Sequence, residues 1–229
     1  MNNKLEKNKK NPISENFKNK FEEEKGFSFA EDDNTNFSIT VPSYFAQEQK
    51  KILHFFQPKS KVLHILDLGA CQTFGTYQFK KIDLEIDFII PRWHRSIILP
   101  NGDIYLFGGA DAKNTQKKLN NCYIYDPVKL ILRGIPNMKI PRSNHSVTFL
   151  KEYIYIIGGE TIGEKAVADC ERINIKSKVW EQLPPMSVAT KGAMVCSFQD
   201  RFIYKIGGKK DEATLSTVIE RLDINKKEW

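Results

Sequence analysis

The chain has few of the residues that build disulfide scaffolds, zinc centres or membrane spans. It contains four cysteines among 229 residues, and no two of them show the CxxC spacing of a zinc site. No apolar run approaches the twenty residues of a membrane span, and the polar first 25 residues lack the apolar stretch of a secretory signal. These absences predict a cytoplasmic protein whose cysteines are reduced and act mostly as small buried hydrophobes.

The sequence also lacks the common patterns of catalytic and cofactor-binding sites. Its four histidines have no metal-ligand spacing. There is no Gly-x-Ser-x-Gly nucleophile elbow and no Gly-Lys-Ser/Thr loop to hold a phosphate. We therefore expect no catalytic residue, no bound cofactor and no metal ion, and we predict that the protein is not an enzyme.

Three pairs of adjacent glycines recur at nearly constant spacing. Each pair ends a short apolar run, and successive pairs lie 50 and 49 residues apart. The pairs are Gly108-Gly109, Gly158-Gly159 and Gly207-Gly208. A fixed period near fifty is typical of an array of similar units. We predict that each pair ends a strand where the backbone needs a positive φ or approaches another segment closely.

Other residues repeat with the glycines, and each unit reads as four short strands. Trp180 returns as Trp229 at the same interval of 49 residues. The best-defined unit predicts strands over residues 146–150, 153–157, 170–175 and 179–183. The second strand is apolar on both faces, which is typical of a strand buried on both sides. Lys205 interrupts this pattern in the last unit, which suggests that one face is less buried there.

These residues resemble the kelch repeat. The shared pattern is a basic residue, an apolar strand, Ile-Tyr-x-x-Gly-Gly, a Tyr-Asp-like pair and a Trp before Leu-Pro, and it covers residues 91–229. Leu132 stands where the second unit should have its Trp. The resemblance implies an all-β fold, namely a segment of a β-propeller built from four-stranded antiparallel blades.

The chain divides into a head, an uncertain segment and four units. The predicted divisions are a disordered polar head (1–25), an uncertain segment (26–60), a degenerate blade (61–90) and three kelch blades (91–140, 141–188 and 189–229). Within these, residues 46–56 are compatible with a short amphipathic helix, and residues 62–68 and 82–86 read as strands. The last blade is truncated where its fourth strand should begin, at Trp229. Kelch propellers usually have more blades, so we predict an incomplete ring whose open blade edges favour self-association.

The strongest positional signal for a binding site is basic. Arg92, Arg142 and Lys191 precede the first strand of each kelch blade, and we predict that they occupy equivalent positions at the mouth of the central channel. Three cations that converge there would attract an acidic segment of a protein partner. The alternative is that each cation only braces its own blade.

We predict a non-catalytic protein–protein interaction module that acts as a scaffold or adaptor. One alternative is a propeller enzyme of the oxidase or epimerase type. Another is weak nucleic-acid binding, because the net charge is +7 and lysines recur in the loops between strands two and three. These lysines have no aromatic residues between them for base stacking, so nucleic acid is not the expected partner.

Overall fold

The computed structural model describes residues 52–67, 79–127 and 129–229, and all of them belong to one compact unit, Lys50–Trp229. The predicted disordered head (1–25) and most of the uncertain segment lie outside the described residues. The described secondary structure consists of fourteen strands and one short 3₁₀ helix, η2 (Ile162–Glu164). None of the described helical residues forms a segment with the length and hydrophobicity of a membrane span.

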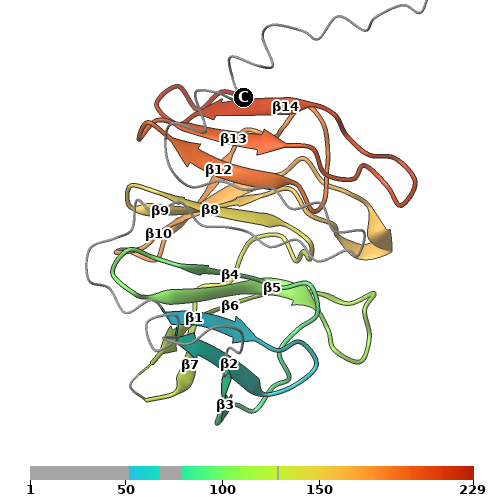
Figure 1. Ribbon diagram of the computed structural model, residues 1–229. Coiled ribbons are helices and arrows are strands. Elements are labelled where there is room, and N and C mark those ends of the chain that lie inside the picture. Colours follow the sequence, from blue (N-terminus) through green and yellow to red (C-terminus); the bar gives the residue numbers. More distant parts are fainter. Residues whose placement is uncertain (1–51, 68–78, 128) are drawn as a thin grey trace, which may run out of the picture. The chain divides into compact units, whose positions relative to one another are not determined.

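Four antiparallel sheets follow one another along the chain, and within each sheet the strands lie in chain order (Figure 1). The first sheet contains β1 (Ile52–Phe56), β2 (Val62–Asp67) and β3 (Phe79–Asp83). The second contains β4 (Arg95–Ile98), β5 (Ile104–Ala110), β6 (Lys118–Asp126) and β7 (Ile131–Ile135). The third contains β8 (Ser146–Leu150), β9 (Tyr153–Ile157), β10 (Cys170–Asn174) and β11 (Trp180–Leu183). The fourth contains β12 (Met194–Phe198), β13 (Phe202–Ile206) and β14 (Ile219–Asp223).

The strands of the third sheet lie almost where the sequence predicts them. β8 and β9 have the predicted ends, while β10 and β11 are each one residue shorter. The first sheet differs more. Residues 52–56 form β1 rather than the end of a helix, and β3 covers 79–83 rather than 82–86. The apolar alternation continues past β3 because Leu84 is also buried, although it lies outside the paired strand.

Apolar clusters join each sheet to the next. Phe56 and Leu63 of the first sheet pack with Leu106 of the second. A second cluster joins the β4–β7 sheet to the β8–β11 sheet, and a third joins the latter to β12–β14. The central strand β5 is buried along its whole length, as the apolar pattern predicts. The four sheets stack as blades without closing into a ring, so the described chain forms an incomplete β-propeller (Figure 1).

The paired glycines end the second strand of three blades in a conformation that other residues rarely adopt. All six have positive φ. A Cβ atom at Gly159, where φ is 105°, would lie 2.7 Å from the carbonyl oxygen of Ser143. A Cβ atom at Gly109 would lie 2.6 Å from the carbonyl oxygen of Arg92. Both predicted reasons for glycine, positive φ and close backbone approach, therefore hold at these two positions.

The two repeated tryptophans make the same hydrogen bond at successive blade junctions. The indole Nε1–H of Trp180 donates to the carbonyl oxygen of Pro136 at 2.8 Å. The indole of Trp229 donates to the carbonyl oxygen of Pro184, also at 2.8 Å. Each indole thus ties the segment that precedes a blade to the blade itself, because a half-buried Trp N–H needs an acceptor.

Candidate functional site

The residues just before the first strand of the last three blades lie next to one another, and their equivalence can be read from backbone pairing. Arg92 and Lys191 each bridge the residue that follows a glycine pair, namely Ala110 and Lys209. In the blade between them, Ser143 makes this bridge, and it pairs with Glu160. Arg92 and Lys191 are therefore equivalent, but the prediction that Arg142 shares their position is wrong by one residue.

The length of one hairpin turn causes this shift. Two residues, 151–152, separate β8 from β9, whereas three residues, 199–201, separate β12 from β13. Counting back a fixed number of residues from the glycine pair therefore gives Arg142 in the β8–β11 blade, one residue before the true equivalent, Ser143. Backbone hydrogen bonds give the correct match, because Gly109 N–H donates to the carbonyl of Arg142 as Gly159 N–H donates to that of Thr190.

Arg142 is enclosed within its own blade. Its side chain is fully buried, and Nη2 donates to Oε1 of Glu171 at 3.0 Å. Nη1 donates to the carbonyl oxygens of Gly158 and Asp169, both at 2.7 Å. This geometry matches the bracing alternative, because a partner can reach the guanidinium only if the blade opens.

Lys191 belongs to a buried polar cluster centred on Glu160. The Lys191 ammonium lies 2.6 Å from Oε2 of Glu160 and 2.5 Å from Oε1 of Glu212. Oε1 of Glu160 also accepts from Lys118 at 2.8 Å and from the Ser143 hydroxyl at 3.0 Å. Burial raises the pKa of Glu160, but these hydrogen bonds outweigh it and lower the pKa to about 2. Glu160 is thus a carboxylate at any physiological pH.

Arg92 has a different environment. Its guanidinium carbon lies 5.7 Å from the centre of the Trp93 ring, which is within the range of a cation–π contact. Its buried Nε has no hydrogen-bond partner, and among the described residues no carboxylate pairs with it. Of the three predicted cations, Arg92 is therefore the one whose charge is not already neutralised by an ion pair.

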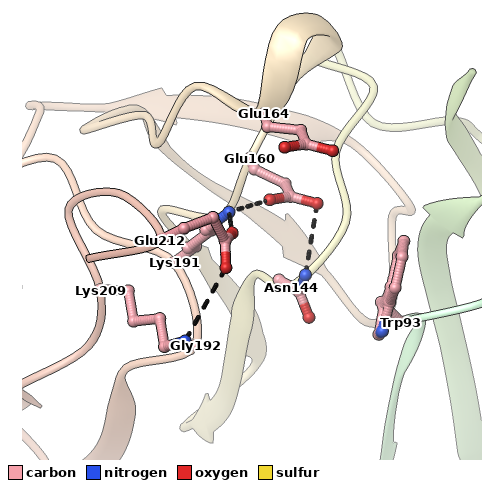
Figure 2. Close-up of a pocket in the computed structure, with 8 residues that line it drawn as sticks. All are labelled: Trp93, Asn144, Glu160, Glu164, Lys191, Gly192, Lys209 and Glu212. Carbon is pink, nitrogen blue, oxygen red and sulfur yellow. Dashed lines mark hydrogen bonds and ion pairs between the residues drawn. The ribbon is translucent and has the colours of Figure 1, made fainter. Parts of the chain in front are cut away.

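A hollow of about 470 Å³ opens beside the Glu160 cluster (Figure 2). Trp93, Asn144 and Gly192 line it from three equivalent positions, and each has positive φ. Figure 2 shows Trp93 on one side and Lys191, Glu212 and Lys209 on the other, with Asn144 between them. Of the three predicted cations, Lys191 lines this hollow.

The hollow carries mixed charge rather than the predicted excess of positive charge. Three carboxylates, those of Glu160, Glu164 and Glu212, face two ammonium groups, those of Lys191 and Lys209. Trp93 is its one aromatic lining residue and is 43% exposed. Sequence reasoning missed Trp93, although a large aromatic residue between two basic residues in a loop is the signal that could have identified it.

The described residues offer little for catalysis. No three His, Cys, Asp or Glu side chains among them are grouped as metal ligands. Burial raises the pKa of the Cys122 and Cys170 thiols to about 12, so neither is a thiolate nucleophile at neutral pH. Both are buried as expected, whereas Cys196 is exposed. Burial also lowers the pKa of His145 well below its usual value, so this imidazole is neutral.

Known proteins show similarity over most of the chain. A family model described as the KLHDC2/KLHL20/DRC7 Kelch-repeats domain matches residues 57–229. Kelch repeat and BTB domain-containing protein 2 of horsepox virus is 32% identical over 163 residues, which cover 63% of this chain and 29% of the viral protein. Kelch-like protein 40a of Danio rerio is 25% identical over 127 residues, which cover 53% of this chain and 21% of that protein.

Alpha-scruin of Limulus polyphemus is similar over a longer stretch. It is 25% identical over 200 residues, which cover 80% of this chain and 22% of alpha-scruin. The chain therefore spans less than a third of the length of each of these relatives.

Proposed function

Because the chain belongs to the kelch-repeat family, we propose that it is a non-catalytic protein-interaction module. The observation that carries this proposal is the hollow beside Trp93, which combines an exposed indole of one blade with charged groups from the next two blades. Tryptophan is one of the residues that most often dominate the energy of protein interfaces. The module would act as a scaffold or adaptor in the cytoplasm.

The partner surface can be tested with a substitution that the fold already tolerates. Asn144 occupies the position of Trp93 in the next blade, so Trp93→Asn should preserve the positive φ, which asparagine adopts readily. A partner isolated with the immobilised chain under reducing conditions, then purified, should bind Trp93→Asn at least tenfold more weakly in calorimetry. Leu130→Asn is the matched control, because Leu130 also has positive φ and is 37% exposed. Equal loss in both variants, or no loss in Trp93→Asn, would remove the hollow from the interface.

Self-association through the last sheet is a second candidate activity. Ile157 and Cys170 are buried against the next sheet, whereas their equivalents Ile206 and Ile219 are 38% and 63% exposed. Met194 (65%) and Phe198 (52%) are also exposed on β12. An apolar patch of this kind is typical of an interaction surface.

Sedimentation velocity tests this second candidate. Ile219→Asp should shift the chain towards the monomer, because it places a charge in the middle of the exposed apolar face. Ile162→Asp serves as the control, since Ile162 is 72% exposed in the short helix η2, outside the last sheet. A parent chain that is monomeric at all concentrations contradicts self-association without affecting the proposal for the hollow.

The two alternative functions make different demands. A propeller enzyme of the oxidase or epimerase type would need a metal or a group of catalytic residues, and turnover of a substrate by the purified chain would establish it. A nucleic-acid binder would show a steep decrease of affinity with salt. The loop lysines give this alternative limited support, because Lys118 is buried on Glu160 and Lys209 lies 3.9 Å from Glu212.

A further inference from the structure

Arg95, like Arg92, is a partly buried cation and differs from the most buried lysines and arginines of the described chain, which are all paired. Every described lysine or arginine that is less than a tenth exposed has a carboxylate partner within 4 Å. These residues are Lys118, Arg142, Arg172, Lys191 and Lys205. Arg95 is half-buried at the start of β4, yet it has no ion pair within residues 52–67, 79–127 and 129–229. Burial without a countercharge is costly, and it lowers the pKa of Arg95.

Arg95 lines a second hollow, of about 390 Å³. Its walls are mostly apolar or aromatic, and they come from the first two sheets. They consist of Phe55, Phe56, Pro58, Trp93 and His94, with Ser96 as a further polar group beside Arg95. Phe55 is 59% exposed and Trp93 is 43% exposed, so aromatic surface remains open to a ligand. A mostly apolar hollow with a few fixed polar groups is the usual form of a binding pocket.

A hydrogen bond to the next blade fixes the orientation of the Arg95 guanidinium. The Nε–H of Arg95 donates to the carbonyl oxygen of His145 in the next blade at 2.9 Å. Nδ1 of His94 lies 2.8 Å from the carbonyl oxygen of Pro91, so this nitrogen carries the proton as the donor. Burial lowers the pKa of His94, which leaves a neutral imidazole as part of the wall. Arg95 is thus oriented by one carbonyl acceptor, while its two terminal NH₂ groups remain available to donate to a ligand.

We infer that this hollow, the Arg95 pocket, binds a carboxylate side chain of a protein partner together with an adjacent aromatic or apolar side chain. The inference rests on the proposed role as a protein-interaction module. Arg and carboxylate form strong, geometrically specific hydrogen bonds, and the carboxylate would neutralise a charge that is otherwise unpaired. The aromatic walls would cover the neighbouring apolar side chain. Because Trp93 lines both hollows, a single partner segment can occupy both.

Short peptides of defined chemistry test the Arg95 pocket on the full chain. The probes are acetyl-Phe-Glu-Phe-amide and its neutral counterpart acetyl-Phe-Gln-Phe-amide, titrated by protein-observed NMR. We expect the acidic peptide to shift the Trp93 indole signal and to bind at least tenfold more tightly than the neutral one. Arg95→Gln should abolish this preference. Arg133→Gln should not, because Arg133 carries the same charge but pairs with Asp126 on the surface.

Ser96 provides a second variant that does not depend on removing Arg95. Ser96 is exposed, so Ser96→Glu should fold, place a carboxylate beside the guanidinium and weaken acidic-peptide binding at least tenfold. Ser96→Gln should bind as the parent does. Equal binding of acidic and neutral peptides, or unchanged binding in Ser96→Glu, overturns the inference.

Two further arms separate other ligands from a protein partner. Tighter binding of a single-stranded oligonucleotide than of the acidic peptide, lost in Arg95→Gln, would mean that the pocket takes phosphate and would overturn the carboxylate assignment.

Residues 27–33 of the chain itself read Phe-Ser-Phe-Ala-Glu-Asp-Asp. If replacing Glu31, Asp32 and Asp33 by their amides strengthens peptide binding tenfold, the occupant is this segment and not a partner. The two proposals can fail independently. If the parent chain prefers the acidic peptide but Trp93→Asn does not weaken partner binding, the Arg95 pocket stands and the proposed partner surface fails.

Discussion

The third and fourth sheets bury equivalent carboxylates but neutralise them with cations from different places. Glu171 of β10 pairs with Arg142, which precedes the first strand of its blade. Glu220 of β14 pairs with Lys205, which lies in the second strand, at 3.1 Å. Each carboxylate also accepts a backbone N–H of the preceding linker, from Lys139 and Ser187 respectively. Both blades therefore have the carboxylate and its hydrogen bond to the backbone, but the cation that pairs with it comes from a different position in each blade.

This difference explains why Lys205 interrupts the apolar strand of the last unit. One face of this strand is less buried, as expected, but Lys205 itself is fully buried. The less buried face is the opposite one, which carries Ile206. In the fourth sheet Thr190 stands at the position of Arg142, and Lys205 stands at that of Ile156. The fourth sheet has no cation at the position of Arg142, but it has one at another position that faces the equivalent carboxylate.

The largest expected effect comes from removing the third sheet's cation. Arg142→Met should lower the free energy of unfolding by about 3 to 5 kcal/mol, because it leaves the Glu171 carboxylate buried without a countercharge. It also removes the donors to the Gly158 and Asp169 carbonyls. Urea unfolding measures the loss. A decrease below 1 kcal/mol would contradict a bracing role for Arg142.

Removing the fourth sheet's cation should cost less. Lys205→Met should lower the free energy of unfolding by about 2 to 3 kcal/mol, since Glu220 keeps the Ser187 N–H and hydroxyl as donors. Adding Thr190→Arg to Lys205→Ile recreates the arrangement of the third sheet and should recover about 1 kcal/mol or more of that loss. A double variant no more stable than Lys205→Ile would show that the two positions are not interchangeable.

Glycine substitutions in the same two blades should lower the free energy of unfolding by different, smaller amounts. Gly158→Ala, at the position equivalent to Gly207 and with a similar positive φ, should destabilise by about 1 to 3 kcal/mol, because positive φ and the close Thr190 carbonyl both oppose a side chain. At Gly207 a Cβ atom would meet nothing closer than 3.5 Å, so Gly207→Ala should cost about 1 kcal/mol from backbone conformation alone. Thermal unfolding of the pair checks the order. Equal losses of stability would mean that backbone conformation accounts for the effect of both substitutions and that the close carbonyl contributes nothing.

The last prediction concerns acid sensitivity. The position after the glycine pair holds Glu160 in the third sheet's blade and Lys209 in the fourth's. The pKa of Glu160 is lowered from its usual 4.5 to about 2. Its ionised form therefore adds stability that is fully present above pH 4.5 and is lost as the pH falls towards 2. Glu160→Gln should be less stable than the parent at pH 7, and its stability should fall less between pH 4.5 and 2. Parallel pH profiles of the two proteins would contradict this role.

The sequence by itself determined the repeat, the strand order and the special backbone positions. The glycine pairs, the tryptophans and the apolar runs are local signals, because positive φ and strand burial depend on the residue and its neighbours in the chain. β8 and β9 accordingly lie at the predicted residues. Residues 52–56 were misread as helical because a short apolar run has no clear period, and pairing with β2 makes them a strand.

Only the tertiary structure decided which charged side chains are free. Arg142, Lys191 and Arg92 look alike in the sequence, yet the first is sealed in its blade, the second is paired and the third is unpaired. A turn shorter by one residue places Arg142 out of register with the other two, and the packing of the blade around it decides that its charge is paired and inaccessible. These are contacts between residues distant in the chain, so the repeat predicts the blades, and the packing between strands and blades selects the residues available to a partner.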